Sequence, residues 1–318
     1  MAPFSEATRV RRAETREDSS TVYVGTADTE WSIGAVPHGG YVLALVLNAL
    51  IAHQTGSTHP DPIHITAHFL RSTSPGPFSV RVKLYRVGRV TANLGAELWQ
   101  AGTLRVTTHA IFSVLDTASA PDTIPLTLAP PAPYARLTPF RVPPARTPVT
   151  QTRSSEIMRF AHHLVQAREP SVAEHQAPAN GAELGEYWSF EDPAEPLTPA
   201  ALALFADLFP NVLPRLVRES RAGGKQSESW HPTLVLSLEF KFPVPRDMRV
   251  IGSFAASRFV NDPNARHDVY VELWTAPGEI GSGRDERRLW REEQRCVAVA
   301  HQTAMLVPWA ANQRRAKM

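Results

Sequence analysis

The 318-residue sequence has a single cysteine, almost no net charge and no long apolar run. Cys296 alone forms neither an internal disulfide nor a cysteine-based zinc cage, which favours a reducing compartment. Lys and Arg number 33 and Asp and Glu 31, without the concentrated basic face that nucleic-acid binding requires. The longest apolar stretch, 42–52, contains Asn48 and falls far short of the ~20 residues of a membrane span. We therefore expect no nucleic-acid partner and no membrane span.

The two ends of the chain carry different signals. Residues 1–20 are charged and lack the apolar segment of a secretory signal peptide, so we expect a frayed tail. The last three residues, Ala316, Lys317 and Met318, are similar to the Ser-Lys-Leu address read by a peroxisomal import receptor. The alternative is a solvated basic tail. The expected location is accordingly the peroxisome or the cytoplasm.

Proline divides the chain. Nine of the 28 prolines fall between Ser119 and Val149. Because proline removes backbone donors and fixes φ, we expect an extended connector there rather than a packed element. The predicted organisation is an N-terminal domain over 1–118, a linker over 119–149 and a C-terminal domain over 150–318.

Each part combines one apolar helix with several strands. The first helix, 41–52, is apolar on nearly every side, which is typical of a helix inside a core. The second begins at a Thr198 cap followed by Pro199 and runs to about Leu208. Alternating, β-rich segments predict the strands, at 63–70, 78–87, 90–100 and 103–115 in the first part and at 233–242, 249–259, 267–275 and 296–307 in the second. Helical spacing of Phe160, Leu164 and Val165 predicts further helix within 154–191.

The two parts share short sequence matches in the same order. Phe69 corresponds to Phe240, Glu97-Leu98-Trp99 to Glu272-Leu273-Trp274, and His109 to His301. Matches in one order predict two copies of one unit, each a central helix wrapped by a curved antiparallel sheet. We call residues 1–118 the first copy and residues 150–318 the second copy.

This unit resembles a hotdog domain, and the pair resembles the acyl-CoA thioesterase II family of double-hotdog enzymes over about 21–307. The resemblance is carried by five segments, Gly39-Gly40, Phe69-Leu70-Arg71, Ala206-Asp207, Phe240-Lys241-Phe242-Pro243 and 297–302. It implies an α+β double hotdog with two central helices, each wrapped by a curved antiparallel sheet, and the two sheets joined into one. Paired hotdogs commonly assemble further, so we expect a homo-oligomer.

The resemblance also implies a catalytic set. In that family an Asp, a Thr or Ser and a Gln together hold the hydrolytic water, and these positions become Asp207, Thr233 and Gln302. A shift along the strand would favour Ser237 over Thr233, since alternate residues of a strand point to the same face. Each of the three residues also has an ordinary structural interpretation, as a satisfied helix carboxylate or a polar strand residue.

The internal repeat provides a separate check on this set. The first copy has Ala110 where the second has Gln302, Pro62 where it has Thr233, and no Asp between residues 41 and 52. Ser237 fails the check, because Thr66 stands at the equivalent position. Polar residues at the three positions are therefore not demanded by the fold, and we predict one active site per chain.

The predicted function is hydrolysis of an acyl thioester to free acid and CoA. His38, Gly39 and Gly40 are the candidate substrate contacts, with glycine amides at a helix start as oxyanion donors. We expect no cofactor apart from the coenzyme A of the substrate, and no metal, because His162-His163 lacks a suitably spaced partner. The alternatives are an accessory protein that binds or releases an acyl or polyketide thioester in a biosynthetic pathway and a non-catalytic lipid-binding module.

Overall fold

The computed structural model describes residues 2–115, 128–130, 132–150, 157–174, 182–208, 229–261, 263–284 and 289–314. The proposed address, Ala316, Lys317 and Met318, lies outside this set. Among the described residues, no helix combines the length and the apolar character needed to cross a membrane.

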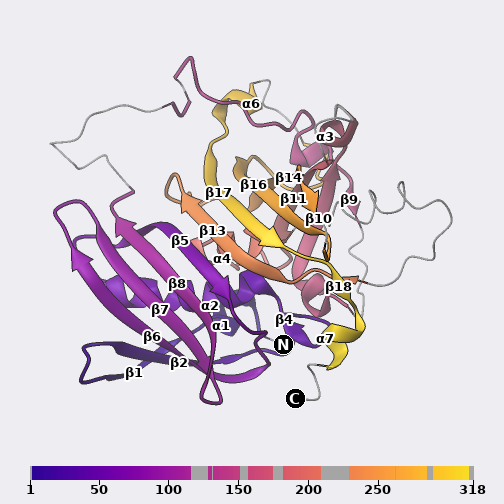
Figure 1. The fold of residues 1–318 in the computed structure, drawn as a ribbon. Coiled ribbons are helices and arrows are strands. Elements are labelled where there is room, and N and C mark those ends of the chain that lie inside the picture. The colour runs from indigo at the N-terminus through magenta and orange to yellow at the C-terminus, as the bar shows by residue number, and fades with distance from the viewer. Residues whose placement is uncertain are drawn as a thin grey trace.

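One 14-stranded sheet runs through both copies (Figure 1). The strands of the first copy follow one another in the order β1 (Arg11–Thr15), β2 (Thr21–Ala27), β6 (Gly76–Val87), β7 (Ala92–Gln100), β8 (Thr103–Ser113) and β5 (Asp61–Phe69). Those after the junction follow in the order β13 (Thr233–Phe240), β17 (Cys296–Ala304), β16 (Arg266–Ala276), β14 (Val250–Ser257), β11 (Ala182–Phe190), β10 (Leu164–Glu169) and β9 (Val149–Thr150), with β15 (Val260–Asn261) beside β16. β5 and β13 pair antiparallel, so the predicted joining of the two sheets is confirmed.

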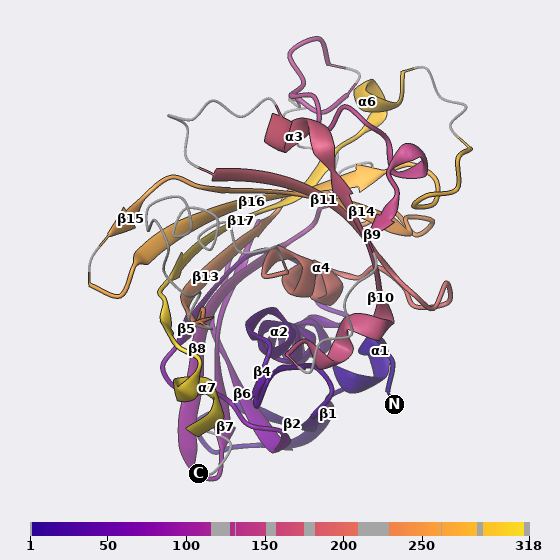
Figure 2. The same ribbon diagram turned by 90° about the vertical axis from the view of Figure 1, so that its right-hand side faces the viewer.

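The two central helices lie side by side within the curve of this sheet (Figure 2). α2 (Gly39–Gln54) and α4 (Pro199–Ala206) are apolar on almost every side, and all eight residues of α4 except Pro199 are buried. Thr198 caps α4 by accepting a hydrogen bond from the Ala201 amide, as predicted. The α+β double-hotdog architecture expected from the sequence is therefore present.

The remaining elements are short. The helices are α1 (Phe4–Ala7), α3 (Pro170–Glu174), α6 (Trp290–Glu293) and α7 (Ala310–Arg314), with 3₁₀ turns η2 (Pro144–Arg146) and η3 (Arg159–His163). Two small ribbons pair β3 (Ser32–Ile33) with β4 (Val36–Pro37), and β12 (Ser229–Trp230) with β18 (Val307–Pro308).

Strand registers relate the two copies residue by residue. Thr66 and Ser237 face each other across the β5–β13 junction, and their equivalence makes the junction two-fold symmetric. One residue before that pair, Ile65 corresponds to Leu236. Ile65 pairs with Ala110 and Leu236 pairs with Gln302, so Ala110 corresponds to Gln302. The Trp99 indole donates to Glu97 at 2.9 Å, and Trp274 donates to Glu272 at the same distance. The structure thus gives the same residue correspondence that the sequence matches indicate.

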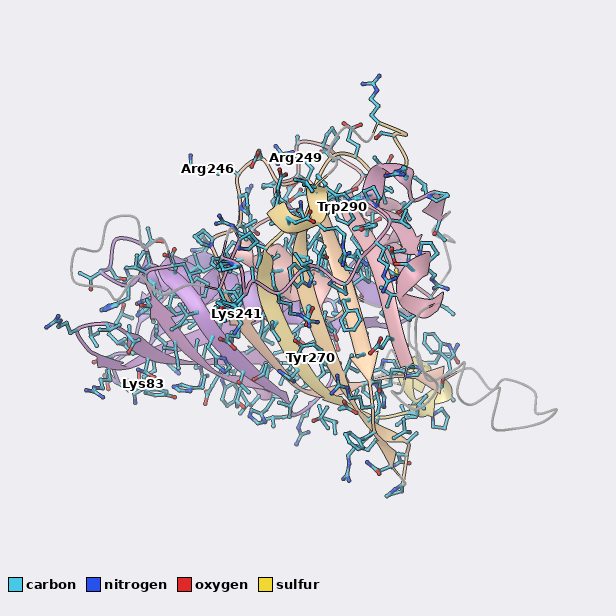
Figure 3. The ribbon with its side chains drawn as sticks, turned by 90° about the horizontal axis from the view of Figure 1, so that it is seen from above. Lys83, Lys241, Arg246, Arg249, Tyr270 and Trp290 are labelled. Atoms are coloured by element: carbon cyan, nitrogen blue, oxygen red, sulfur yellow. The ribbon has the colours of Figure 1, made fainter. Side chains whose placement is uncertain are left out.

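The proline-rich segment is not the unpacked connector that we expected, at least over its described part. The Phe140 side chain is fully buried on the outer face of the second copy, 5.1 Å from the Tyr187 ring. Gly185 and Gly252 leave room for it, because a Cβ atom on Gly252 would lie 2.3 Å from Phe140. Proline limits backbone hydrogen bonding but does not prevent side-chain packing. Trp290 of α6 joins the same outer cluster, and Tyr270 of β16 packs against this cluster further along the sheet (Figure 3).

The prediction of helix within 154–191 is wrong for most of the described part. Phe160 lies in η3, but Leu164 and Val165 belong to β10, which pairs with β11. A five-residue 3₁₀ turn followed by a strand imitates helical spacing over a short window. Residues 154–156 and 175–181 lie outside the described set.

The N-terminal segment is also ordered, contrary to the predicted frayed tail. Phe4 is 2% exposed and packs edge-on to Trp31 at 5.0 Å, and β1 extends the sheet beyond β2. The charged residues that suggested a tail occupy an exposed edge strand, whereas a single aromatic residue anchors the chain.

Candidate active site

The candidate site begins where the two central helices meet. Asp207 follows the last residue of α4, and its Oδ2 atom accepts a hydrogen bond from the Gly40 amide in the first turn of α2, at 2.7 Å. A Cβ atom on Gly40 would lie 2.5 Å from the Ala203 carbonyl oxygen, so the close approach requires glycine. The Asp207 side chain is 7% exposed. The amide and the positive end of α2 thus stabilise a nearly buried carboxylate.

Thr233 approaches the other oxygen of this carboxylate. Its Oγ1 lies 3.2 Å from Asp207 Oδ1 and 3.4 Å from Gln302 Oε1. The register of β13 against β17 shifts between Thr233 and Val235, and such a bulge reverses the alternation of faces. The expectation that Thr233 and Ser237 share a face is therefore wrong: Ser237 hydrogen-bonds to Thr66 at the junction instead.

Gln302 completes the group from β17. Its Nε2 donates to the Ala206 carbonyl oxygen at 2.9 Å, which orients the amide and leaves Oε1 turned toward Thr233. The side chain is buried at 4% exposure. Asp207, Thr233 and Gln302 thus come together from a helix end and two neighbouring strands, although 95 residues of sequence separate the first from the last.

His38 precedes α2 and lies against Asp207. Its Nε2 is 3.1 Å from the Asp207 carbonyl oxygen and 3.6 Å from Oδ2. Because a carbonyl only accepts hydrogen bonds, this nitrogen carries a proton, and in the neutral ring Nδ1 is then an acceptor. Nδ1 is buried without a partner among the described residues, so it has capacity for a further donor.

A cavity of roughly 270 Å³ opens beside these residues and is lined by both copies. His38, Gly39 and Thr233 form the part of its wall next to Asp207, and Ser72 and Thr73 add further hydroxyls. Most of the remaining lining is apolar, including Ile33, Val36, Val42, Phe69, Trp230, Leu234, Met305 and Val307. Arg71 also lines the cavity. The sequence indicated this cation only through the Phe69-Leu70-Arg71 motif. Trp230 and Met305 gave no signal, since only the folded registers bring them to the cavity. Of the three predicted substrate contacts, Gly40 donates its amide to Asp207, whereas His38 and Gly39 line the cavity.

The equivalent positions of the first copy are apolar. The bulge in β13 has a counterpart in β5, where the register against β8 shifts between Pro62 and His64. The bulge therefore belongs to the fold, while the hydroxyl at its first residue occurs only in the second copy. Ala110, opposite Ile65, is fully buried.

Cys296 offers no competing nucleophile at neutral pH. Burial, together with the neighbouring Glu272 carboxylate, raises the pKa of its thiol to about 12. Since the thiolate is the reactive form, this side chain is chemically inert under physiological conditions.

Each half of the chain is similar to a domain of known proteins. The model of the acyl-CoA thioesterase N-terminal domain matches residues 8–114, and that of the acyl-CoA thioesterase C-terminal domain matches residues 139–306. A curated relative, the ustilagic acid biosynthesis cluster protein orf2 of Mycosarcoma maydis, is 38% identical over 112 residues, which cover 31% of this chain and 29% of that protein.

Two solved structures share the fold over nearly the whole chain. The acyl-CoA thioesterase II TesB2 of Mycobacterium marinum aligns with a TM-score of 0.65 and 15% identity over 96% of this chain and 98% of its own. A conserved protein with a hot dog fold from Alicyclobacillus acidocaldarius aligns with a TM-score of 0.68 and 17% identity over 96% and 97%. Since the two domain models together match most of the sequence, the chain belongs to the acyl-CoA thioesterase family of double-hotdog proteins.

Proposed function

We propose that this protein hydrolyses an acyl-CoA thioester to the free acid and coenzyme A, with the water held by Asp207, Thr233 and Gln302. The observation that carries the proposal is the nearly buried Asp207 carboxylate beside a two-copy cavity, with the Thr233 hydroxyl and the Gln302 amide oxygen next to it. A fold needs no such cluster, because the equivalent residues of the first copy are apolar.

The geometry suggests how the water would be oriented. The amide nitrogen of Gln302 is engaged by Ala206, so its Oε1 atom accepts one O–H of the water. Asp207 accepts the other and takes this proton as the oxygen attacks the thioester carbonyl. The C–S bond then breaks, and the leaving thiolate of coenzyme A takes up the proton that Asp207 accepted, which restores the carboxylate. Fixing the water against the carbonyl replaces a random encounter with an aligned one.

The oxyanion that forms during attack needs donors on the opposite side of the carbonyl. The Gly39 amide lies at the first turn of α2, where backbone N–H groups have no partner within the helix. Glycine at this position lines the cavity, and a Cβ atom on it would lie 2.7 Å from Asp207 Oδ2, so glycine lets the carboxylate lie against the backbone. His38 Nδ1 would accept a hydrogen bond from a polar group of the substrate.

Thiol release from a panel of thioesters tests the proposal. The panel runs from short to long and aromatic acyl-CoAs, and wild type is compared with Asp207→Ala. We expect release from at least one acyl-CoA, lost in the variant. No release from any member by a folded wild-type protein would overturn the hydrolysis of CoA esters.

The orf2 relative supports a second candidate function. Its name places that protein in a biosynthetic cluster. In this second candidate, the cavity holds a thioester of a biosynthetic pathway and the protein acts as an accessory that releases it. Adding carrier-protein thioesters of the same acyl groups to the panel separates the two. Preference for the carrier-bound form by a factor of ten or more in kcat/KM would favour the accessory function.

A further inference from the structure

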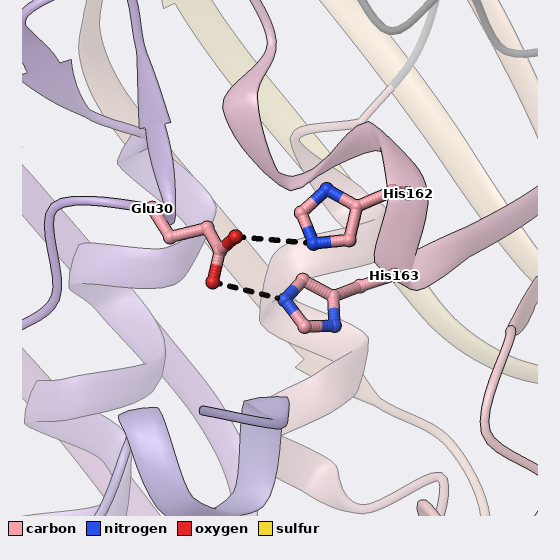
Figure 4. Close-up of side chains that lie close together, drawn as sticks. All are labelled: Glu30, His162 and His163. Carbon is pink, nitrogen blue, oxygen red and sulfur yellow. Dashed lines mark hydrogen bonds and ion pairs between the residues drawn. The ribbon is translucent and has the colours of Figure 1, made fainter. Parts of the chain in front are cut away.

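A second polar cluster lies apart from Asp207, between the two copies. Glu30 comes from the loop between β2 and β3, and His162 and His163 end the 3₁₀ turn η3 (Figure 4). We expected no metal at His162-His163 because the sequence near them has no suitably spaced partner, and Glu30, 133 positions from His163, is such a partner in space. The structure brings one carboxylate and two imidazoles together within 4.8 Å.

The two segments are held together independently of the cluster. The Gly34 amide donates to the Ile157 carbonyl oxygen at 2.6 Å, and Trp31 stacks on Phe160 with ring centroids 5.2 Å apart. Trp31 also stacks on His163 at 5.1 Å. The three polar side chains are therefore positioned by surrounding packing, as in sites that are formed before their ligand arrives.

The distances within the cluster suit a shared metal ion. His162 Nε2 lies 3.0 Å from Glu30 Oε1, and His163 Nε2 lies 3.2 Å from Oε2. Atoms bound about 2.1 Å from one metal lie about 3.0 Å apart at a right angle and about 3.4 Å apart at a tetrahedral angle. Side chains of Glu30 and His163 are 15% and 18% exposed, whereas His162 is 41% exposed and leaves solvent a route to the cluster.

The tautomer of His162 points to a ligand as well. Its Nδ1 lies 3.0 Å from the Arg159 carbonyl oxygen, which only accepts, so Nδ1 carries the proton. Nε2 then faces the Glu30 carboxylate at 3.0 Å, an arrangement that requires either a proton on Nε2 or a metal cation between the two atoms. Histidines that bind metals usually donate their other N–H to such a carbonyl or carboxylate.

We propose that Glu30, His162 and His163 bind one divalent transition-metal ion of the zinc class through two imidazole nitrogens and a carboxylate. Two nitrogen ligands and one oxygen ligand suit Zn²⁺ better than Mg²⁺ or Ca²⁺, which prefer oxygen alone. The ion fastens η3 of the second copy to the β2–β3 loop of the first. It thereby fixes Phe160, which packs edge-on to His38 at 5.4 Å, beside the candidate active site.

Calorimetric titration of the chelator-treated full chain with Zn²⁺, without a histidine tag, tests this site. We expect one equivalent to bind and the melting temperature to rise by several degrees at a hundredfold excess over Kd. Glu30→Gln preserves the size of the side chain but removes its charge and one of its two acceptor oxygens, and we expect it to weaken binding by at least about tenfold and to abolish most of the rise. His162→Asn should behave alike, and its exposed position makes loss of folding a small concern.

The matched control is His109→Asn, which removes an exposed histidine of β8 outside the cluster and should bind Zn²⁺ as wild type does. The visible spectrum of the Co²⁺-loaded chain gives a second readout, since it reports the coordination of the metal and should change in Glu30→Gln. Absence of one-to-one binding, or unchanged affinity and spectrum in both Glu30→Gln and His162→Asn, would overturn the proposal and leave a proton-bridged network.

Discussion

The two copies share one backbone plan but differ in two places, the helix end that meets the partner helix and the outer face of the sheet. In the second copy, Asp207, Thr233 and Gln302 converge, whereas the first copy has Pro62 and Ala110 at the positions of the last two. The second copy also has a covered outer face, where Glu272 is 3% exposed, while its counterpart Glu97 is only partly buried. A duplicated fold can thus keep its packing in both copies and its polar cluster in one.

Removing the charge of Asp207 should have the largest effect. Asp207→Asn keeps the size of the side chain but removes the proton acceptor, so we expect thiol release to fall by at least about a thousandfold. The melting temperature should change by only a few degrees. Turnover within tenfold of wild type in a folded variant would remove Asp207 from the chemistry.

The two strand hydroxyls provide a matched pair. Thr233→Val removes the hydroxyl beside Asp207 at nearly constant volume, and we expect kcat to fall about 10- to 100-fold. Ser237→Ala removes the hydroxyl at the junction, which should cost about 0.5–1.5 kcal/mol of folding free energy with kcat nearly unchanged. Steady-state kinetics together with urea unfolding separates the two effects, and a reversed outcome would assign the site to Ser237.

The contact between the helices is sensitive to one methyl group. A Cβ atom at Gly40 meets the Ala203 backbone at 2.5 Å, so Gly40→Ala should destabilise the chain by about 1–3 kcal/mol and lower kcat through displacement of Asp207. Gly88→Ala is the control, because the nearest atom to its Cβ lies at 3.3 Å. Urea unfolding of both variants measures the difference. Equal free energies of unfolding for the two variants would contradict the prediction and mean that the two helices move apart without loss of stability.

The buried Glu186 of β11 should give the second copy a pH dependence of its own. Burial raises the pKa of Glu186 from 4.5 to about 8, partly opposed by Arg168. The folded state then binds a proton more tightly than the unfolded state, so its stabilising contribution is complete below pH 4.5 and declines up to about pH 8. Glu186→Gln should flatten the decline in unfolding free energy across this interval. An unchanged slope would show that another group is responsible.

Much of the fold was predictable because its signals are local. Two helices apolar on every side, alternating strands and the repeated Glu-Leu-Trp segment together indicate two wrapped helices, and strand registers confirm the correspondence. The N-terminal strand and the covering segment were missed because single residues, Phe4 and Phe140, anchor chains that are otherwise polar or rich in proline. One aromatic residue leaves no periodic signal.

The candidate site was predictable only in part. The resemblance and the repeat pointed to Asp207, Thr233 and Gln302, and the structure brings these side chains together. The choice between Thr233 and Ser237 depended on a bulge, which changes the face of a strand without changing its sequence pattern. The proximity of Glu30 to His162 could not be predicted for a similar reason, since it arises from tertiary packing alone.

The central claim is that each chain has one active site and that its water-holding residues, Asp207, Thr233 and Gln302, all come from the second copy. Its most direct test measures single-turnover thiol release by wild type, Asp207→Asn, Ala110→Gln and the double variant. We predict that Ala110→Gln leaves the rate unchanged, because the first copy lacks the partner residues, and that the double variant is as inactive as Asp207→Asn. Restoration of hydrolysis in the double variant would place a working site in the first copy and contradict the account.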